Sequence, residues 1–352
     1  MTVIDLFSGV GGLSLGFQTA GFSIVLANEI DSEIANAYIN NHPTVKMINN
    51  DITKMCIKKT FYEFQKKVTV IIGGPPCQGF SQKGSRKSIN DDRNFLFKYF
   101  YNIVEFIQPD YFLMENVPNL LTTENGLFKN QIMELFGNAG YTIDSRILNA
   151  AMFGVPQNRK RAFILGRRGS IMCTLPTSKS TRISVDDAIS DLSFLKSGEG
   201  QKKQEYLYAP RTEYQERLRA NTNILHNHIS TCHSALAIYK MSLVPPKKGK
   251  EVLPSHMLTK SIYSGTWSRL IGDDVSVTIT TRFDTPSSGR FVHPTLNRCI
   301  TPREAARLQS FPDDFIFYGS KSSIMKQIGN AVPPILATEI AKIIANDIKS
   351  KV

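Results

Sequence analysis

Short apolar runs alternate with helix-like segments along the first half of the chain. The runs are typical of buried strands in a parallel sheet, and they are Val3–Phe7, Ile24–Ala27, Val68–Ile72, Tyr111–Met114 and Ala162–Leu165. The helix-like segments between them are Leu13–Ala20, Ser32–Asn41, Phe95–Ile107 and Leu127–Ala139. Alternating strands and helices predict an α/β fold, with a doubly wound and mostly parallel sheet that helices cover on both faces.

The pattern becomes irregular after Arg168, where short segments bearing Ser, Thr, Lys and Pro follow one another. Within this region, residues 275–279 alternate apolar with polar side chains, as a half-buried strand does. Regular periodicity returns at Pro302–Ser310, where proline occupies a first helical position. The amphipathic run Ile335–Ile348 follows, and we expect it to cover the first sheet, so that the chain returns to its first domain.

The length of 352 residues suggests two domains, because domains usually contain about 100 to 200 residues. We expect residues 1–175 and 320–352 to form the first domain and residues 176–319 to form a smaller, irregular one. No stretch approaches the roughly 20 apolar residues of a membrane span, and the first residues are too few and too acidic for a signal peptide. These features predict a cytoplasmic protein with no membrane partner.

The formal net charge of +12 suggests a polyanionic partner, and the charge is unevenly distributed. Residues 1–50 carry one Lys or Arg against four Asp or Glu, whereas residues 201–250 carry nine against three. The acidic end resembles a small-molecule site, and the basic middle resembles a surface that contacts phosphates. The five cysteines are widely spaced without a Cys-x-x-Cys pair, which argues against a disulfide framework and a zinc ribbon.

A glycine-rich loop, Asp5–Gly12, joins the first expected strand to the first helix. Glycines in such a loop let the backbone approach a ligand closely, although a tight turn would also explain them. Glu29 ends the second strand some twenty residues later, where a carboxylate can accept both hydroxyls of a ribose, and Asp51 follows a third segment. Together they predict a nucleoside cofactor site, which NAD would fit equally well.

A cysteine, Cys77, follows the apolar run Val68–Ile72 within Gly73–Ser81, and Pro75 with Pro76 excludes a helix there. The end of a parallel strand is a suitable place for a nucleophile, although most free cysteines are small buried hydrophobes. Glu115 ends the expected central strand, so we expect it at the same rim, although such a residue is often a helix cap or an ion-pair partner. A nucleophile and a carboxyl group could then act on opposite sides of one flat ring.

These segments resemble the motifs of the DNA (cytosine-5)-methyltransferase family, of the bacterial and phage restriction–modification type. The matching segments, in family order, are Phe7–Gly12, Pro75–Gln78, Glu115–Val117, Gln157–Arg161, Arg303–Gln309 and Gln327–Val332. They leave only about residues 169–270 uncovered. The resemblance implies a Rossmann-like domain that uses S-adenosyl-L-methionine, a smaller target-recognition domain, and double-stranded DNA in the cleft.

The resemblance also implies a covalent mechanism. The Cys77 thiolate would add to carbon 6 of a flipped-out cytosine, so that carbon 5 can take the methyl group of S-adenosylmethionine. Glu115 would hold or protonate N3 of the ring. Arg159 and Arg161, two apart on an extended segment, would face the same side, stabilise the thiolate and grip the base carbonyl or its phosphate. A solvated strand edge is the plainer interpretation of such an arginine pair.

Two further residue sets follow from the resemblance. The set for the cofactor is Phe7, Gly9, Gly11, Gly12, Glu29, Ile30, Asp51, Ile52, Pro76, Leu96 and Asn330. In it Phe7 lies beside the adenine, Glu29 binds the ribose and Asp51 binds the adenine amino group, while Ile30 replaces an aromatic residue of relatives. The set for DNA is Gln78, Ser81, Lys83, Arg86, Arg93, Thr281 and Arg282. Residues 81–94 suit a loop that closes over the flipped base, or an ordinary solvated loop.

Several alternatives stay open. His226, His228, Cys232 and His233 form the only metal-like cluster in the sequence, but their spacing does not support a site, and we expect a polar loop facing DNA and no metal. The same chemistry on transfer RNA is an alternative, although the Cys-Phe-Thr sequence of that branch is absent. The others are a catalytically inactive DNA-binding protein and an NAD-dependent dehydrogenase. We expect a nucleoid-associated monomer, for which a restriction endonuclease acting on the same site is a conceivable partner.

Overall fold

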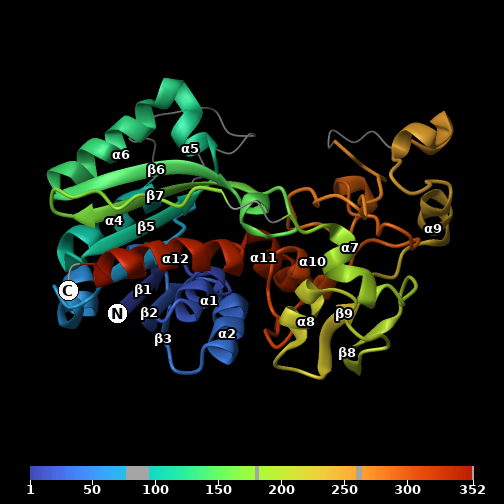
Figure 1. Cartoon of the computed structure of the whole chain (residues 1–352), viewed down its shortest axis with the longest axis horizontal. Helices are drawn as coiled ribbons and strands as arrows, with labels where there is room; N and C mark the ends of the chain where they lie inside the picture. Colours follow the sequence, from blue (N-terminus) through green and yellow to red (C-terminus); the bar gives the residue numbers. More distant parts are fainter. Residues whose placement is uncertain (77–94, 179–181, 259–263, 351–352) are drawn as a thin grey trace. The chain divides into compact units, whose positions relative to one another are not determined.

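The structure is a computed structural model that describes residues 1–76, 95–178, 182–258 and 264–350 (Figure 1). The chain divides into two compact units. The first contains residues 1–149, 160–179 and 334–352, and the second contains residues 150–159 and 180–333. Relative to the expected boundaries, residues 150–159 and 320–333 belong to the second unit.

The first unit is built on a seven-stranded sheet with the order β3-β2-β1-β4-β5-β7-β6. The strands are β1 (Thr2–Leu6), β2 (Ser23–Glu29), β3 (Lys46–Asn49), β4 (Val70–Gly73), β5 (Tyr111–Asn116), β6 (Tyr141–Asn149) and β7 (Lys160–Arg168). Strands β3, β2, β1, β4 and β5 pair in parallel, whereas β7 is antiparallel to both β5 and β6. The expected doubly wound, mostly parallel sheet is confirmed.

Helices cover both faces of this sheet (Figure 1). They are α1 (Gly12–Thr19), α2 (Ser32–Asn41), α3 (Ile57–Phe61), α4 (Phe95–Ile107), α5 (Asn119–Thr122), α6 (Leu127–Asn138) and α12 (Pro334–Lys349), with 3₁₀ turns at Ile52–Lys54, Tyr62–Phe64 and Thr123–Gly126. Side chains of α4 and α6 pack with Phe112 and Met114 of β5 into one apolar cluster. On the opposite face α12 packs against α1, and Tyr111 of β5 and Arg167 of β7 both contact Asp347 of α12.

Local chemistry explains where these helices begin and how closely they pack. The Asp31 carboxylate caps α2 by accepting hydrogen bonds from the backbone N–H groups of Glu33 and Ile34. In α1, a Cβ atom added to Gly16 would lie 2.3 Å from the Cβ of Ala337 on α12. The contact between α1 and α12 therefore requires glycine at this position.

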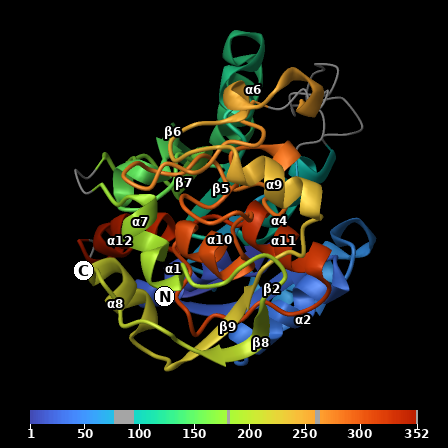
Figure 2. The ribbon, with the colours of Figure 1, turned by 90° about the vertical axis from the view of Figure 1, so that its right-hand side faces the viewer.

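The second unit is less regular, as expected, and its elements are labelled in Figure 2. They are the antiparallel strands β8 (Gly200–Glu205) and β9 (Ile224–Ile229), the helices α7 (Val185–Ile189), α8 (Glu213–Arg219), α9 (Ala235–Ser242), α10 (Pro302–Leu308) and α11 (Lys321–Asn330), and 3₁₀ turns at Ala150–Phe153, Ser190–Leu192, Lys250–Val252, Ser255–Met257 and Pro286–Ser288. Helix α10 contacts β9, α7 and α11, so it is central to this unit.

The core of the second unit contains an unusual number of buried charges. Arg298, Arg303 and Arg307 are fully buried around α10. The Arg307 guanidinium pairs with Asp191 and Asp313 at 2.6 Å each, and Arg303 donates to the backbone carbonyls of residues 226, 312 and 315. Buried arginines of this kind need partners for nearly every donor, and these contacts supply them.

The expected strand at residues 275–279 is wrong. Only Ser276 forms a bridge, with Gln157, while Val277 is exposed and Ile279 is buried. Hydrogen bonds from this segment go to Pro156, Gln157 and residue 158 instead of to a neighbouring strand. Among the described residues, no single helix is long and apolar enough to cross a membrane.

Candidate active site

A pocket lies in the first unit at the carboxyl ends of β1, β2, β3 and β4. We call it the Glu29 pocket, and its lining residues are Phe7, Asn28, Glu29, Ile30, Asn50, Asp51, Ile52, Pro76 and Leu96. Ligands of open α/β sheets bind at this edge, outside the carboxyl ends of the strands. The structure thus brings together Phe7, Glu29, Ile30, Asp51, Ile52, Pro76 and Leu96 of the set expected for the cofactor.

The Glu29 carboxylate is held in place by two backbone donors. Gly9 N–H donates to Oε2 and Asp31 N–H donates to Oε1, each at 2.9 Å. Burial raises the pKa of Glu29 above its ordinary value, while these hydrogen bonds oppose the shift. Each carboxylate oxygen has a second lone pair, so the fixed side chain can still accept the two hydroxyls of a ribose.

The glycine loop wraps around this carboxylate in a conformation that few residues adopt. Phe7, Gly9 and Gly11 have φ values of 56°, 55° and 98°, all in the left-handed region. A Cβ on Gly11 would lie 2.4 Å from Nε2 of His42, so only glycine fits there. Gly12 is the first residue of α1. The N–H groups of Ser8 and Gly9 donate to the carbonyl of Asn28 and the carboxylate of Glu29, so the loop is tied to the end of β2.

A buried polar chain lies beneath the loop. Ser14 Oγ donates to Asp5 Oδ2 and shares a hydrogen bond with the Tyr38 hydroxyl, both at 2.7 Å. Burial raises the pKa of Asp5 to about 7, with a smaller contribution from Glu29, and it lowers the pKa of His42 to about 4. Burial therefore favours the uncharged forms of both the Asp5 carboxyl group and the His42 imidazole.

Two further polar side chains line the pocket: Asp51, which the sequence predicted, and Asn28, which it did not single out. Asn28 Nδ2 donates to the carbonyls of Ile48 and Asn50, each at 2.9 Å, and so ties the end of β2 to the segment after β3. Asp51 Oδ1 accepts from the N–H and hydroxyl of Thr53, which lower the pKa of Asp51. The sequence did carry a signal for Asn28, because this residue directly precedes Glu29, the predicted acid at the end of the strand.

A second cluster forms at the ends of β4 and β5. Arg161 on β7 contacts Glu115 on β5, with Nε 3.0 Å from Oε1. The other carboxylate oxygen, Oε2, lies 3.1 Å from where a Cβ of Gly74 would be, and Asn116 Nδ2 donates to the carbonyl of Pro75 at 2.8 Å. This rim places a carboxylate and a guanidinium beside the backbone that leads to Cys77. Cys77, Gln78, Ser81, Lys83, Arg86 and Arg93 lie outside the described residues.

Arg159 and Arg161 make different contacts and belong to different units. Arg159 is buried in the second unit, where Nη1 donates to the carbonyl of Ile279 at 3.1 Å and Nη2 donates to that of Gly329 at 2.9 Å. Through these two contacts the guanidinium supports the segments around residues 279 and 329. The remaining expected residues, Thr281, Arg282 and Asn330, also belong to the second unit, and the last two are exposed.

The histidine cluster divides into separate roles. His228 is buried, with its ring nitrogens 2.9 Å from Thr301 Oγ1 and 3.1 Å from the carbonyl of Leu192. His233 Nε2 accepts from the N–H of Cys299, whereas His226 and Cys232 line a different pocket. Within the described ranges, no group of His, Cys, Asp and Glu side chains could hold a metal ion.

A Rossmann-like sheet, a recess with a fixed carboxylate at its carboxyl edge and an acid–arginine rim are typical of an α/β enzyme with a nucleoside cofactor. The family model of C-5 cytosine-specific DNA methylases matches residues 1–346. The chain is 37% identical to type II methyltransferase M.DdeI of Desulfomicrobium norvegicum, over 97% of this chain and 88% of the relative. It is 38% identical to M1.HphI of Haemophilus parahaemolyticus, over 97% and 86%. A solved prophage-encoded protein of Escherichia coli, assigned as a DNA modification methyltransferase, superposes with a TM-score of 0.80 at 30% identity, covering 99% of both chains.

The chain therefore belongs to the C-5 cytosine-specific DNA methylase family. It is a sequence-specific DNA (cytosine-5)-methyltransferase of the restriction–modification type, with S-adenosyl-L-methionine as methyl donor and DNA as substrate. The resemblance expected from the ordered motifs is confirmed. Family membership also decides the cofactor in favour of S-adenosylmethionine over NAD.

Proposed function

We propose that the rim of Glu115 and Arg161 holds the target cytosine and that Cys77 is the nucleophile of the methyl transfer. The observation that carries this proposal is the contact of 3.0 Å between the two rim side chains beside Gly74. Cys77 follows Pro75 and Pro76 in the sequence, directly after β4, which pairs with β5. Its assignment is supported by this position and by the order of the family's motifs.

The chemistry follows from the electron demand of the pyrimidine. The Cys77 thiolate forms a bond to carbon 6, and the ring electrons make carbon 5 nucleophilic enough to take the methyl group. Glu115 holds or protonates N3, which removes the negative charge that builds on the ring, while Arg161 orients the carboxylate. Loss of the carbon 5 proton to water, with return of any N3 proton to Glu115, restores the ring double bond and expels the thiolate. The base must leave the duplex for this attack, because stacked neighbours cover its face.

We infer that the Glu29 pocket holds S-adenosylmethionine, which supplies an electrophilic methyl group when bound. The chemistry of the lining suits the nucleoside part of this molecule, because a carboxylate held by Gly9 N–H lies among the apolar side chains of Phe7, Ile30 and Leu96. Glu29 would accept the ribose hydroxyls and Asp51 the adenine amino group. Gly11 and Gly12 shape the loop, and Asn330 is retained from the family motif as a further contact. Ile30 is 65% exposed, so it offers apolar surface for the adenine.

We further propose that the second unit selects the DNA sequence. Its charge balance supports this role, because residues 201–250 carry nine basic against three acidic side chains. Thr281 and Arg282 would contact DNA from this unit, and Gln78, Ser81, Lys83, Arg86 and Arg93 from the first. Arg159 would act by positioning the segments around residues 279 and 329.

The partners and location are inferred from the activity. Since restriction–modification systems pair a methyltransferase with a nuclease, we propose that a cognate restriction endonuclease acts on the same DNA site. One copy of the chain carries every motif, so we propose a monomer. A DNA substrate places the enzyme in the cytoplasm with the nucleoid.

Methyl transfer to duplex DNA and to transfer RNA, with labelled S-adenosylmethionine, tests this proposal. We expect incorporation into DNA only, and Glu115→Gln and Arg161→Met are expected to lower its rate by about 10²-fold or more, as loss of a catalytic proton donor or charge partner does. Arg146→Met is the matched control, because Arg146 makes a similar 3.0 Å contact with Asp144 on the edge strand β6. Labelling of transfer RNA alone, or equal rates for the rim and control variants, would overturn it.

A further inference from the structure

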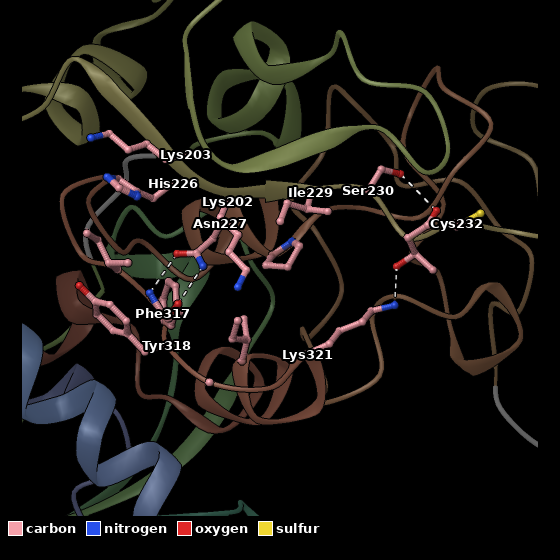
Figure 3. Close-up of a pocket in the computed structure, with 15 residues that line it drawn as sticks. Lys202, Lys203, His226, Asn227, Ile229, Ser230, Cys232, Phe317, Tyr318 and Lys321 are labelled. Atoms are coloured by element: carbon pink, nitrogen blue, oxygen red, sulfur yellow. Dashed lines mark hydrogen bonds between the residues drawn. The ribbon is translucent and has the colours of Figure 1, made fainter.

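A second pocket lies wholly within the second unit, between the paired strands β8 and β9, the start of α10 and the segment that enters α11 (Figure 3). We call it the Lys202 pocket, and it is lined by Lys202, Lys203, His226, Asn227, Ile229, Ser230, Thr231, Cys232, Pro302, Ile316, Phe317, Tyr318, Gly319, Lys321 and Ile324. Its volume of about 490 Å³ falls within the range of roughly 300 to 1,000 Å³ for pockets that hold small organic ligands. None of its lining residues belongs to the site of methyl transfer described above.

The wall of this pocket is apolar and preformed. Ile229, Ile316 and Ile324 supply aliphatic surface, and Pro302 is the first residue of α10. Asn227 fixes one side, because Nδ2 donates to the carbonyl of Phe317 at 2.8 Å and Oδ1 accepts from its N–H at 2.9 Å (Figure 3). A ligand would therefore meet a shaped apolar surface without ordering a loop, which lowers the entropic cost of binding.

The charged groups of the pocket have one sign. The lining residues include three lysines and no Asp or Glu. Lys321 is held by Thr231 Oγ1 at 2.9 Å and by Asp284 at 2.8 Å, and in the part of the chain that the structure describes no ion pair involves Lys202 or Lys203. Burial, together with the charges of Arg303 and Lys203, lowers the pKa of His226. Figure 3 shows Lys203 and Lys321 on opposite sides of the pocket, each with its ammonium group directed away from the other.

We propose that the Lys202 pocket binds a small organic anion whose carboxylate or phosphate contacts the lysines and whose apolar body lies on the isoleucines. The combination is specific, because an apolar wall alone would favour a neutral ligand and lysines alone would favour a bare ion. Two classes of ligand combine an anionic group with an apolar body in this way: mononucleotides, and aliphatic or aromatic carboxylates. The Lys202 pocket shares no residue with the sites proposed for the cofactor and the cytosine, so it would be a second small-molecule binding site.

The test uses the full chain saturated with S-adenosylhomocysteine, so that the Glu29 pocket is covered. The probe is 8-anilinonaphthalene-1-sulfonate, an aromatic anion whose fluorescence rises in apolar surroundings. We expect one binding site, and the double variant Lys202→Glu, Lys203→Glu should bind about tenfold more weakly, as loss of charge-assisted contacts predicts. The control is Lys58→Glu, Lys59→Glu, an adjacent lysine pair on α3 in the first unit. Equal affinity of the two double variants would overturn the proposal.

A second measurement needs no variant. Cys232 lines the pocket and is exposed, and Cys56 on the first unit is exposed as well. Bound probe should slow alkylation of Cys232 by iodoacetamide and leave Cys56 unchanged, as read by mass spectrometry. Equal alkylation of Cys232 with and without probe would place the probe elsewhere and contradict the proposal.

Competition distinguishes the two classes of ligand. Adenosine monophosphate is compared with adenosine, and octanoate with octanol, as displacers of the probe. Displacement by adenosine monophosphate identifies a nucleotide site, and displacement by octanoate identifies a carboxylate site. If the neutral partner of each pair displaces the probe as well as the anion does, the lysines contribute nothing and the proposed chemistry is refuted.

Discussion

The ion pair of Arg298 and Glu304 is the contact whose loss should most affect the second unit. Both side chains are fully buried, and two parallel hydrogen bonds of 2.7 Å join Nη1 to Oε2 and Nη2 to Oε1. Glu304 also accepts from the N–H of Thr301 at 2.8 Å in the capping box that begins α10. Burial alone would raise the pKa of Glu304, but the charge and hydrogen bonds of Arg298 outweigh it and lower the pKa to about 2.

The substitution Glu304→Gln keeps the shape of the side chain and removes its charge. A shift of the pKa from 4.5 to about 2 corresponds to about 3 kcal/mol in favour of the ionised form, at about 1.4 kcal/mol per pKa unit. Leaving one charge of a buried pair without its partner costs about 3 to 5 kcal/mol in general. The two values agree, so we expect Glu304→Gln to lower the free energy of unfolding of this unit by about 3 kcal/mol.

The pH dependence follows from the sign of the shift. The pKa of Glu304 is lower in the folded than in the unfolded chain, so its stabilisation is complete above pH 4.5 and is lost as pH falls towards about 2. Glu304→Gln should remove this part of the acid destabilisation. The double variant Arg298→Met, Glu304→Gln should cost less than the sum of the two single variants, because it leaves no isolated charge.

The chain has one tryptophan, Trp267, which is buried in the second unit and so reports on that unit alone. Urea unfolding followed by its fluorescence gives the required free energies. The control is Arg182→Met, which removes an exposed ion pair with Asp274 and should cost less than about 1 kcal/mol. If Glu304→Gln costs no more than this control, or leaves the acid dependence unchanged, the buried pair does not stabilise the unit as reasoned here.

Three further predictions concern the first unit. Glu29→Gln should lower the affinity for S-adenosylmethionine at least about tenfold, because the amide NH₂ would face a backbone donor. Isothermal titration measures this affinity, and an unchanged value would exclude Glu29 from the site. Gly16→Ala should cost about 1 to 3 kcal/mol by calorimetry, because its Cβ would overlap Ala337; Gly137→Ala, with open space around it, is the control, and an equal result for both would refute the close contact. Asp5 has a pKa raised by burial to about 7, so its folded form binds more protons and stability falls as pH rises from 3.8 to about 7. Asp5→Asn should flatten this decline, measured as the melting temperature against pH, and a slope equal to that of the wild type would contradict it.

The apolar runs predicted the central strands well because buried parallel strands are continuously apolar. Two edge strands, β3 and β6, were missed for the opposite reason. In β3 only Met47 and Ile48 are apolar, and both are half-buried, while β6 pairs with β7 alone and carries polar residues at 142, 144, 145 and 146. A strand with one neighbour needs less apolar surface, so its sequence carries a weaker signal.

The positions of Glu29 and Glu115 could be predicted, because each lies at the carboxyl end of an apolar parallel strand. A role that depends on distant segments could not be predicted. The spacing of Arg159 and Arg161 places them together on an extended chain, but Arg159 donates hydrogen bonds to the carbonyls of residues 279 and 329. The Lys202 pocket likewise joins β8, β9 and α11, segments whose association no local pattern indicates.

Trapping on duplex DNA that contains 5-fluorocytosine tests the central claim most directly, because fluorine at carbon 5 blocks the final elimination. The enzyme is incubated with S-adenosylmethionine and a pool of duplexes of varied sequence, with Cys77→Ser as the control. We expect a denaturation-resistant adduct with DNA that is absent from the variant, which would identify the nucleophile, the ring atom and the base together. An adduct of equal yield with Cys77→Ser, or none with any duplex, would contradict the covalent mechanism.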